Sequence, residues 1–412
     1  QATSGDDIVF IATGDRDHSD TYSVGILKST DGGSTWTNTG LTYTAGQKKL
    51  VNRLLNDPTN SSIFYAATTD GVHKSTDDGV TWNLISSEVF IDMEFKPGAS
   101  NIIYGSSKMG GIYKSTNSGN SWNNTLSTSG RRTEMAVSSN NANVVYALMA
   151  AASSGLYGIY KSTNSGSSFT EIYNSPNLLG WSCNGGGSGG QGWYDLCIAT
   201  DPNDVNTVFI GGVNTWKSTD GGNSWNINNH WSSTCGGNAT NVHADKHNLV
   251  FQNSSSTLFE CNDGGLYKTT NSGNTWEHLT NGMVISQMYK LGVAQTTPDD
   301  VITGLQDNGT KALITLNWED VIGGDGMECL IDWSDENIQY GSLYYGDIFK
   351  TTDHWNSSTQ ISGGISGNAA WVTPYVQDPI NSNTLYVGYE DVWKTTDQGQ
   401  SWTQLSSWAG GT

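Results

Sequence analysis

The sequence predicts an all-β fold, a multi-bladed β-propeller built from four-stranded antiparallel blades. Three observations predict it: an eight-residue motif recurs along the chain, four strand-like segments fit into each repeat, and 50 glycines and 16 tryptophans accompany only 14% charged residues. Four short strands in every repeat of this length are typical of propeller blades. Many glycines and aromatic residues with few charges suit short strands joined by tight turns.

The recurring motif is Ser/Thr-x-Asp/Asn-x-Gly-x-Ser/Thr-Trp/Phe, which we call the Asp turn. Its copies occupy residues 29–36, 75–82, 115–122, 162–169, 218–225, 269–276 and 395–402, and a degenerate copy at 351–355 has lost its glycine. Successive copies begin 46, 40, 47, 56, 51, 82 and 44 residues apart, and the gap of 82 residues fits two blades, the first without a motif. The Asp or Asn accepts backbone N–H bonds and the glycine supplies a positive φ. The motif therefore indicates architecture and says almost nothing about catalysis.

Within each repeat the four strands follow in a fixed order. The first ends near Asp-Pro (LLNDP, 54–58), and the second is rich in aromatic residues (IFYAATTD, 63–70). The third alternates (GVHKST, 71–76), and the fourth follows the Asp turn (TWNLIS, 81–86). Alternation with a period of two gives each blade two apolar faces for its neighbours.

Nine blade-like units can be counted in this way. The first begins at its second strand (DIVFIATGD, 7–15) and lacks the usual first strand. We expect a single propeller domain over residues 1–412, forming a piece of a longer secreted protein.

The charge of the chain excludes two classes of partner. A formal net charge of -20 repels phosphate backbones and anionic lipid, so no nucleic acid partner is expected. The longest apolar run, residues 144–152, is too short to cross a bilayer, so no membrane insertion is expected.

The five cysteines show no metal-type C-x-x-C spacing. Cys197 and Cys329 lie in strand-like runs and are predicted to be buried thiols. Cys183 and Cys235 lie in loops rich in Gly, Ser and Asn, and we predict a disulfide between them if the compartment is oxidising.

These motifs resemble the Asp-box (BNR-repeat) superfamily of β-propellers, which includes sialidases, sortilin-type ten-bladed propellers and xyloglucan-cleaving endoglucanases with paired seven-bladed propellers. Longer stretches are similar to secreted Bacteroidetes proteins labelled glycosyl-hydrolase-like, which carry sorting domains for type IX secretion. Those stretches are GGQGWYDLCIATDPND (189–204), NVHADKHNLVF (241–251), CNDGGLYKTTNSGNTW (261–276), GLQDNGT (304–310) and GGDGMECLID (323–332). The resemblance implies a propeller with Asp-box turns that is secreted or held at the outer cell surface.

The resemblance also implies which loops share a face. In Asp-box propellers the box lies on one face, and the other face is made by loops leading into first strands and loops joining second to third strands. Polar residues that do not recur from blade to blade fall on these loops: Asp15, Arg16, Asp17, His18, Asn52, Arg53, Arg131, Arg132, Gln191, Asp195, His243, Asp245, His247, Asp263, Gln306, Asp307, Asn308, Asp325, Tyr344, Tyr345 and Asp347. We expect them to converge around the channel mouth, where propellers bind ligands.

The predicted ligand-binding residues are Trp193, Tyr194, His243, Asp263, Gln306, Asp307, Asp325 and Tyr345. Trp193 and Tyr194, with Trp181, lie in a Gly-rich loop and can stack on sugar rings, although burial is the default for Trp.

Three carboxyl groups are candidates for glycosidase chemistry: Asp195, Asp307 and Asp325. Carboxylates beside glycines are more often turn residues, so this alternative stays open. A sialidase is disfavoured, because the N-terminal Arg-Ile-Pro motif of that family is absent.

His243 and His247 are candidate metal ligands, with structural histidines as the alternative. No cofactor is predicted, and calcium binding is left open.

Two functions remain. The first is a binding or adhesion module for a glycan or protein ligand at the channel-mouth face. The alternative is a xyloglucanase-like glycoside hydrolase acting on a polysaccharide, so whether the chain is an enzyme stays open.

Overall fold

The computed structural model describes residues 8–17, 21–232, 235, 239–297, 299–314 and 316–408. In this part of the chain the strands form nine sheets, and all pairs but one are antiparallel. Seven sheets have four strands, the first has three and the fifth has five. The predicted multi-bladed propeller is confirmed.

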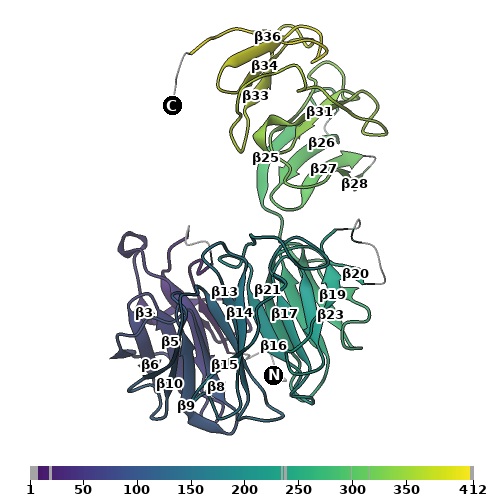
Figure 1. The fold of residues 1–412 in the computed structure, drawn as a ribbon. Coiled ribbons are helices and arrows are strands. Elements are labelled where there is room, and N and C mark those ends of the chain that lie inside the picture. Colours follow the sequence, from purple (N-terminus) through teal and green to yellow (C-terminus); the bar gives the residue numbers. More distant parts are fainter. Residues whose placement is uncertain are drawn as a thin grey trace. The chain divides into compact units, whose positions relative to one another are not determined.

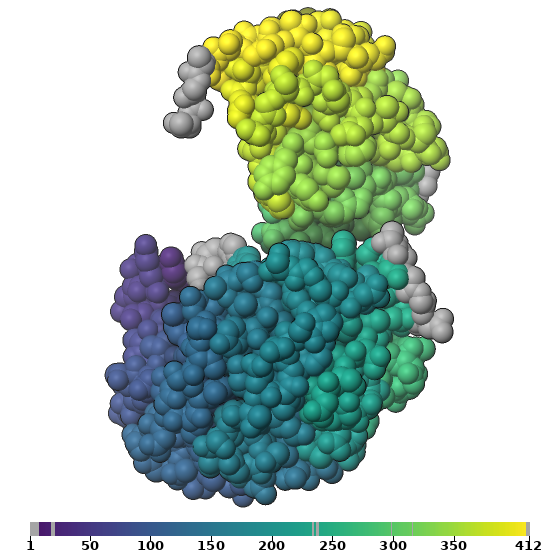
Figure 2. Space-filling model, in the orientation of Figure 1, coloured from purple at the N-terminus to yellow at the C-terminus, as the bar shows by residue number. Residues whose placement is uncertain are grey.

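The chain divides into two compact units, Gln1–Asn281 and Gly282–Thr412. The first unit holds the six sheets that we call blades 1 to 6, and the second holds blades 7 to 9. In Figure 2 the colour runs from purple through blue to green across the first unit, because its blades follow one another in sequence order. The single domain expected over residues 1–412 stays a prediction.

The strands of the first unit carry the labels of Figure 1. They are β1 (Val9–Ala12), β2 (Gly25–Ser29) and β3 (Thr37–Thr42) in blade 1; β4 (Val51–Asn56), β5 (Phe64–Thr68), β6 (Gly71–Ser75) and β7 (Asn83–Ser86) in blade 2; β8 (Asp92–Lys96), β9 (Ala99–Ser106), β10 (Gly111–Ser115) and β11 (Asn123–Ser127) in blade 3; β12 (Thr133–Val137), β13 (Val145–Ala150), β14 (Leu156–Ser162) and β15 (Thr170–Tyr173) in blade 4; β16 (Cys197–Thr200), β17 (Val208–Gly211), β18 (Thr215–Ser218), β19 (Asn226–His230) and β20 (Thr240–Asn241) in blade 5; and β21 (Lys246–Phe251), β22 (Leu258–Asn262), β23 (Gly265–Thr269) and β24 (Glu277–His278) in blade 6.

The second unit repeats the pattern. Its strands are β25 (Met288–Val293), β26 (Val301–Leu305), β27 (Gly309–Ile314) and β28 (Asn317–Ile322) in blade 7; β29 (Cys329–Ile331), β30 (Gln339–Ser342), β31 (Ile348–Thr351) and β32 (Thr359–Gln360) in blade 8; and β33 (Tyr375–Gln377), β34 (Leu385–Gly388), β35 (Val392–Thr395) and β36 (Thr403–Gln404) in blade 9. Single-turn 3-10 segments lie in the loops at Ala45–Gln47 and Tyr344–Gly346. Among the described residues there is no helix with the length and apolar character that crossing a bilayer requires.

Among the described residues, blade 1 has three strands and no innermost one. The Asp turn joins β2 to β3, whereas in blade 2 it joins the third strand β6 to the fourth strand β7, so β1 is a second strand, as the sequence predicted. The first strands of the next five blades contact one another in order, from β4 to β21. They surround a cavity of about 710 Å³, which forms the channel of this unit.

The Asp turn satisfies its own polar groups. Asp31 accepts the backbone N–H of Thr35 at 2.8 Å and the hydroxyl of Ser29 at 2.7 Å, while that hydroxyl accepts the N–H of Gly33 at 2.8 Å. In the degenerate copy, Asp353 and Ser357 form the equivalent bond at 2.9 Å, and Trp355 takes the glycine's place with φ 64°. The turn therefore survives the loss of its glycine.

Apolar cores fill the interfaces between successive blades. Tyr65 and Val72 of blade 2 pack with Phe90 and Ile103 of blade 3, and the last residue of the blade-3 Asp turn, Trp122, packs against the same cluster. Equivalent clusters lie between the other neighbouring blades of each unit. These cores fix the angle between blades and so position the loops at the ends of the strands.

Candidate functional site

Arg132 is the buried centre of the candidate site in the first unit. It lies just before β12 and is 4% exposed. Its Nε donates to Glu134 at 3.0 Å, and its Nη1 donates to the carbonyl oxygens of Trp193 at 3.1 Å and Tyr194 at 2.6 Å. Its Nη2 lies 3.0 Å from Asp17 Oδ1. The planar fork of one arginine thus joins blades 1, 4 and 5 and holds the loop that carries the two aromatic residues.

Two further arginines at the channel are paired with carboxylates. Arg53 Nε lies 3.2 Å from Asp92, and its Nη2 contacts Glu94. Arg16 Nη2 lies 3.1 Å from Glu134. A sialidase-type site needs its arginines free for a substrate carboxylate, so these ion pairs do not support that class of enzyme.

A chain of polar contacts links blades 1, 5 and 6 beside these arginines. The Tyr194 hydroxyl donates to Asp263 at 2.9 Å, and His247 Nε2 lies 2.7 Å from the other oxygen of Asp263. His247 Nδ1 lies 3.4 Å from Asp17. The Tyr194 ring meets His247 edge-on at 4.6 Å and lies 5.4 Å from the ring of Trp193, which is 47% exposed. An exposed indole therefore stands beside ionised and hydrogen-bonding groups.

The two carboxylates control the charge of His247. Burial by itself would lower the pKa of His247, but hydrogen bonds to Asp17 and Asp263, with the charges of both, raise it to about 10. Burial would raise the pKa of Asp17, but the hydrogen bond from His247 and the charges of Arg132 and Arg16 lower it to about 2. His247 is therefore an imidazolium at neutral pH, and neither ring nitrogen offers a lone pair to a metal ion.

His243, the other candidate metal ligand, packs against main chain. A Cβ on Gly264 would lie 2.4 Å from the His243 ring, so the ring covers this glycine closely. The His243 carbonyl oxygen accepts a hydrogen bond from the buried Lys246 ammonium at 2.5 Å. These contacts suit a structural histidine.

Asp195 faces another carboxyl group. It is 0% exposed and lies beside the side chains of Asp245 and Gln191. Burial and the nearby charge of Asp245 raise its pKa well above the usual range. Asp245 accepts a hydrogen bond from Gln191 at 2.8 Å, and one of its oxygens lies within 4.8 Å of an oxygen of Asp263. Asp195 is too deeply buried to touch a ligand itself.

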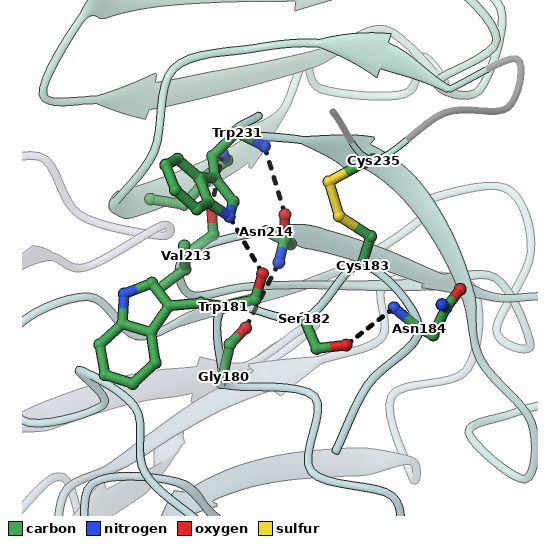
Figure 3. Close-up of a disulfide and its surroundings, with 10 residues drawn as sticks. Gly180, Trp181, Ser182, Cys183, Asn184, Val213, Asn214, Trp231 and Cys235 are labelled. Atoms are coloured by element: carbon green, nitrogen blue, oxygen red, sulfur yellow. Dashed lines mark hydrogen bonds between the residues drawn. A yellow bond between two sulfur atoms is a disulfide. The ribbon is translucent and has the colours of Figure 1, made fainter. Parts of the chain in front are cut away.

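A disulfide joins two loops of blade 5 (Figure 3). The structure has the Cys183–Cys235 bond that the sequence predicts, with the two Cα atoms 5.7 Å apart. Beside it the Trp231 indole N–H donates to the carbonyl oxygen of Trp181 at 3.0 Å. Both indoles are nearly half exposed, which differs from the buried default for tryptophan. Blade 5 thus presents exposed indoles on anchored loops.

The candidate residues of the second unit form turns. The backbone N–H of Asp307, a residue with φ 58°, donates to Asp325 at 2.8 Å. The carbonyl oxygen of Gln306 accepts the side-chain amide of Asn308 at 3.1 Å. These contacts stabilise local backbone, as expected for carboxylates beside glycines.

An aromatic cluster, formed by Tyr344, Tyr345 and Trp371, lies on the surface of the second unit. Tyr344 and Trp371 stack at 5.0 Å with 6° between their planes, and Tyr345 meets Trp371 edge-on at 5.3 Å. Tyr345 has φ 57° and is 60% exposed. A Cβ on Gly324, the neighbour of Asp325, would lie 4.0 Å from the Tyr344 ring. Tyr345 was predicted from the sequence, whereas Trp371 was missed because its loop has no distinguishing motif.

The structure brings part of the predicted set together. Within the first unit, Trp193, Tyr194, Asp263 and His247 form one contiguous group, and Asp195 lies behind it. His18 lies outside the described residues. Cys197 and Cys329 are buried free thiols, as predicted, and Cys261 is an exposed one.

Comparison with known proteins reveals short or distant similarity. No family model matches the chain. A xyloglucanase of Hypocrea jecorina (strain QM6a) is 35% identical over 91 residues, which cover 21% of this chain and 11% of that enzyme. The chain therefore matches only about a tenth of the length of this curated relative.

Solved structures that resemble the chain have low sequence identity to it. The Niastella koreensis GH74 enzyme is 19% identical with a TM-score of 0.45, and the match covers 96% of this chain and 69% of that one. The GH74 xyloglucanase of Xanthomonas campestris is 13% identical with a TM-score of 0.36, over 97% and 78% of the two chains. PorZ, a surface component of the type-IX secretion system of Porphyromonas gingivalis, is 13% identical with a TM-score of 0.49, over 94% and 51%.

Proposed function

We propose that this chain is a secreted or cell-surface propeller that binds a neutral polysaccharide through the loops of blades 5 and 6. The observation that carries the proposal is Trp193, whose ring is 47% exposed although the buried Arg132 fixes its main chain. An aromatic face held ready in this way loses little conformational entropy when it stacks on a sugar ring. The carboxylate of Asp263 lies beside it and can accept hydrogen bonds from sugar hydroxyls.

Two further observations support the class of ligand and the compartment. The net charge of -20 disfavours polysaccharides that carry carboxylates or sulfates, so a neutral glycan is the better fit. The disulfide suits an oxidising compartment outside the cytosol. The short similarity to a xyloglucanase agrees with a glycan ligand.

The test is binding of xyloglucan and other neutral polysaccharides, with alginate as the acidic comparison. We expect Trp193→Ala to weaken binding at least about tenfold, which corresponds to about 1.4 kcal/mol. Trp318→Ala is the matched control, because Trp318 is a similarly exposed indole on the outer strand β28. Equal binding by both variants, or binding of alginate alone, would contradict the proposal.

A second function, glycoside hydrolysis, is favoured by one observation. Oxygen atoms of Asp245 and Asp263 lie within 4.8 Å of each other, and retaining glycosidases hold two carboxyl groups about 5 Å apart. Burial and the charge of Asp263 raise the pKa of Asp245, as a general acid requires. Release of reducing sugar from the bound polysaccharide, abolished by Asp263→Asn, is the expected result for this function. Binding of the polysaccharide without release of reducing sugar would contradict hydrolysis and support the binding function only.

A further inference from the structure

The aromatic cluster of the second unit stays exposed although its three rings pack on one another. Tyr344 and Tyr345 lie in the turn between β30 and β31, and Trp371 lies in the loop that leads into β33. All three side chains are exposed, and even Trp371, which contacts both of the other rings, is 41% exposed. A group of exposed aromatic side chains on a folded protein commonly marks a binding surface.

Contacts from blades 7 and 9 hold the cluster in place. The Trp371 indole N–H donates to the Tyr289 hydroxyl of β25 at 3.3 Å, and the carbonyl oxygen of Trp371 accepts the backbone N–H of Tyr345 at 3.3 Å. The Tyr389 hydroxyl donates to the carbonyl oxygen of Gly346 at 2.6 Å. Tyr345 has φ 57°, a left-handed backbone that is unfavourable for a bulky residue and persists only where its surroundings impose it. The rings are therefore fixed in advance, and binding costs them little conformational entropy.

Carboxylates accompany the rings on the same loops of blades 8 and 9. Asp347 and Glu390 are both exposed. The side-chain amide of Gln360 donates to Asp347 at 2.8 Å, and that of Asn368 donates to Glu390 at 2.6 Å, so each carboxylate is oriented by a neighbour. Carboxylate oxygens accept hydrogen bonds from hydroxyl groups, whereas their negative charge repels an acidic ligand. The surroundings of the cluster thus favour a partner that carries many hydroxyl groups and no negative charge.

We propose that the aromatic cluster is a second carbohydrate site, which stacks on a sugar ring of a neutral polysaccharide. A sugar ring offers apolar C–H faces to the aromatic rings and hydroxyl groups to the carboxylates, so it matches both features of the surface. A quaternary ammonium ion fits less well, because aromatic sites for such cations direct several ring faces at one point. Here Tyr344 covers one face of Trp371, since their ring planes are 6° apart at a distance of 5.0 Å.

The inference rests on the proposed function for the class of ligand and adds a second site to it. Trp193 belongs to the first unit and the aromatic cluster belongs to the second, so the two sites use different loops and different cores. We expect two short oligosaccharides to bind per chain. A polysaccharide that occupies both sites at once should bind more tightly than an oligosaccharide, because its second contact is intramolecular.

Calorimetric titration of the whole chain with oligosaccharides of xyloglucan, mixed-linkage β-glucan and mannan tests the inference. We expect two bound molecules per wild-type chain, and one in Tyr345→Gly or Trp371→Ala, because binding at the cluster weakens at least about tenfold. Glycine accepts the left-handed backbone of Tyr345, so the melting temperature of Tyr345→Gly should stay close to that of the wild type. Trp318→Ala replaces an exposed indole of the same unit and is the matched control, which should keep both sites.

The outcomes separate this inference from the proposed function. Two bound molecules in both cluster variants, or a single molecule that only Trp193→Ala removes, would overturn the inference and support the proposed function. A single molecule that Tyr345→Gly removes and Trp193→Ala does not would support the inference and contradict the site in the first unit. Binding of tetramethylammonium in place of every sugar, lost in Tyr345→Gly, would overturn the inference in favour of a cation site. No binding of any oligosaccharide by the wild type would overturn both.

Discussion

At the scale of single residues, the contacts of His247 with Asp17 and Asp263 make the stability of the first unit depend on pH. The imidazolium lies between two carboxylates that come from blades 1 and 6, so its charge contributes to joining blades far apart in the sequence. The folded-state pKa of about 10 lies above the ordinary value of 6.5. Stability from this group is therefore fully present below about pH 6.5 and is lost as the pH rises through about 10.

Replacement of His247 by Gln should remove this dependence on pH. Each unit of pKa shift corresponds to about 1.4 kcal/mol, so we expect the variant to lose on the order of 3 kcal/mol near neutral pH, and less near pH 10. Chemical denaturation of both proteins between about pH 6 and pH 10 measures the difference. A constant difference over this range would show that the imidazolium has no role.

The predictable part of the site follows from residue type and loop position. Asp263 and Tyr194 could be predicted because their loops depart from the repeat. The role of Arg132 could not, because its contacts with Trp193 and Tyr194 depend on how blade 4 packs against blade 5. The burial of Asp195 could not be predicted either, since a carboxylate beside a Gly-rich loop is usually exposed.

At the scale of structural elements, the Asp turn does more than join two strands. In six of the seven complete turns the glycine approaches the preceding blade, as Gly166 of blade 4 does with Tyr104 of blade 3, and Gly33 of blade 1 is the exception. The strands and turns could be predicted because their signals are local. The left-handed Trp355 could not, because the hydrogen bonds of Asp353 preserve the turn without a glycine.

Gly98 and Gly166 have similar backbone conformations, so substitutions at these two positions distinguish the cost of backbone strain from the cost of a steric contact. Gly166 and Gly98 have φ 68° and 77°, but a Cβ on Gly166 would lie 2.4 Å from the Tyr104 ring, whereas one on Gly98 would meet nothing within 4 Å. We expect Gly98→Ala to cost about 1 kcal/mol through backbone strain, and Gly166→Ala to cost about 2–4 kcal/mol because the contact adds to it. Urea denaturation measures both. Equal losses would mean that the turn shifts freely away from blade 3.

At the scale of the whole molecule, each unit has its own cores and its own candidate residues. The disulfide belongs to the first unit alone and joins residues 52 positions apart. The count of nine blades could be predicted from the repeat, whereas the division after Asn281 could not, because the gap of 82 residues between Asp turns at that point fits two successive blades of a single ring equally well.

Calorimetry should therefore resolve two transitions, and loss of the disulfide should affect only one. Removing a bridge that closes a loop of this length costs up to about 4 kcal/mol on the chain-entropy model. We expect Cys183→Ser combined with Cys235→Ser to lower the transition temperature of the first unit. Tyr340→Phe removes a buried hydroxyl of the second unit that has no described partner. This variant should leave the transition temperature of the first unit unchanged and raise that of the second unit slightly. A single transition shifted by every variant would contradict independent unfolding.

The self-contained Asp turn has a consequence for how such a chain arises. Its hydrogen bonds close within eight residues, and each core uses side chains of two adjacent blades only. A gene that gains or loses one repeat by unequal recombination then disturbs one interface and leaves every other turn intact. The loops opposite these turns take part in neither constraint, so we expect duplicated blades to diverge there first, in the segments that hold the tryptophans and carboxylates of the candidate site.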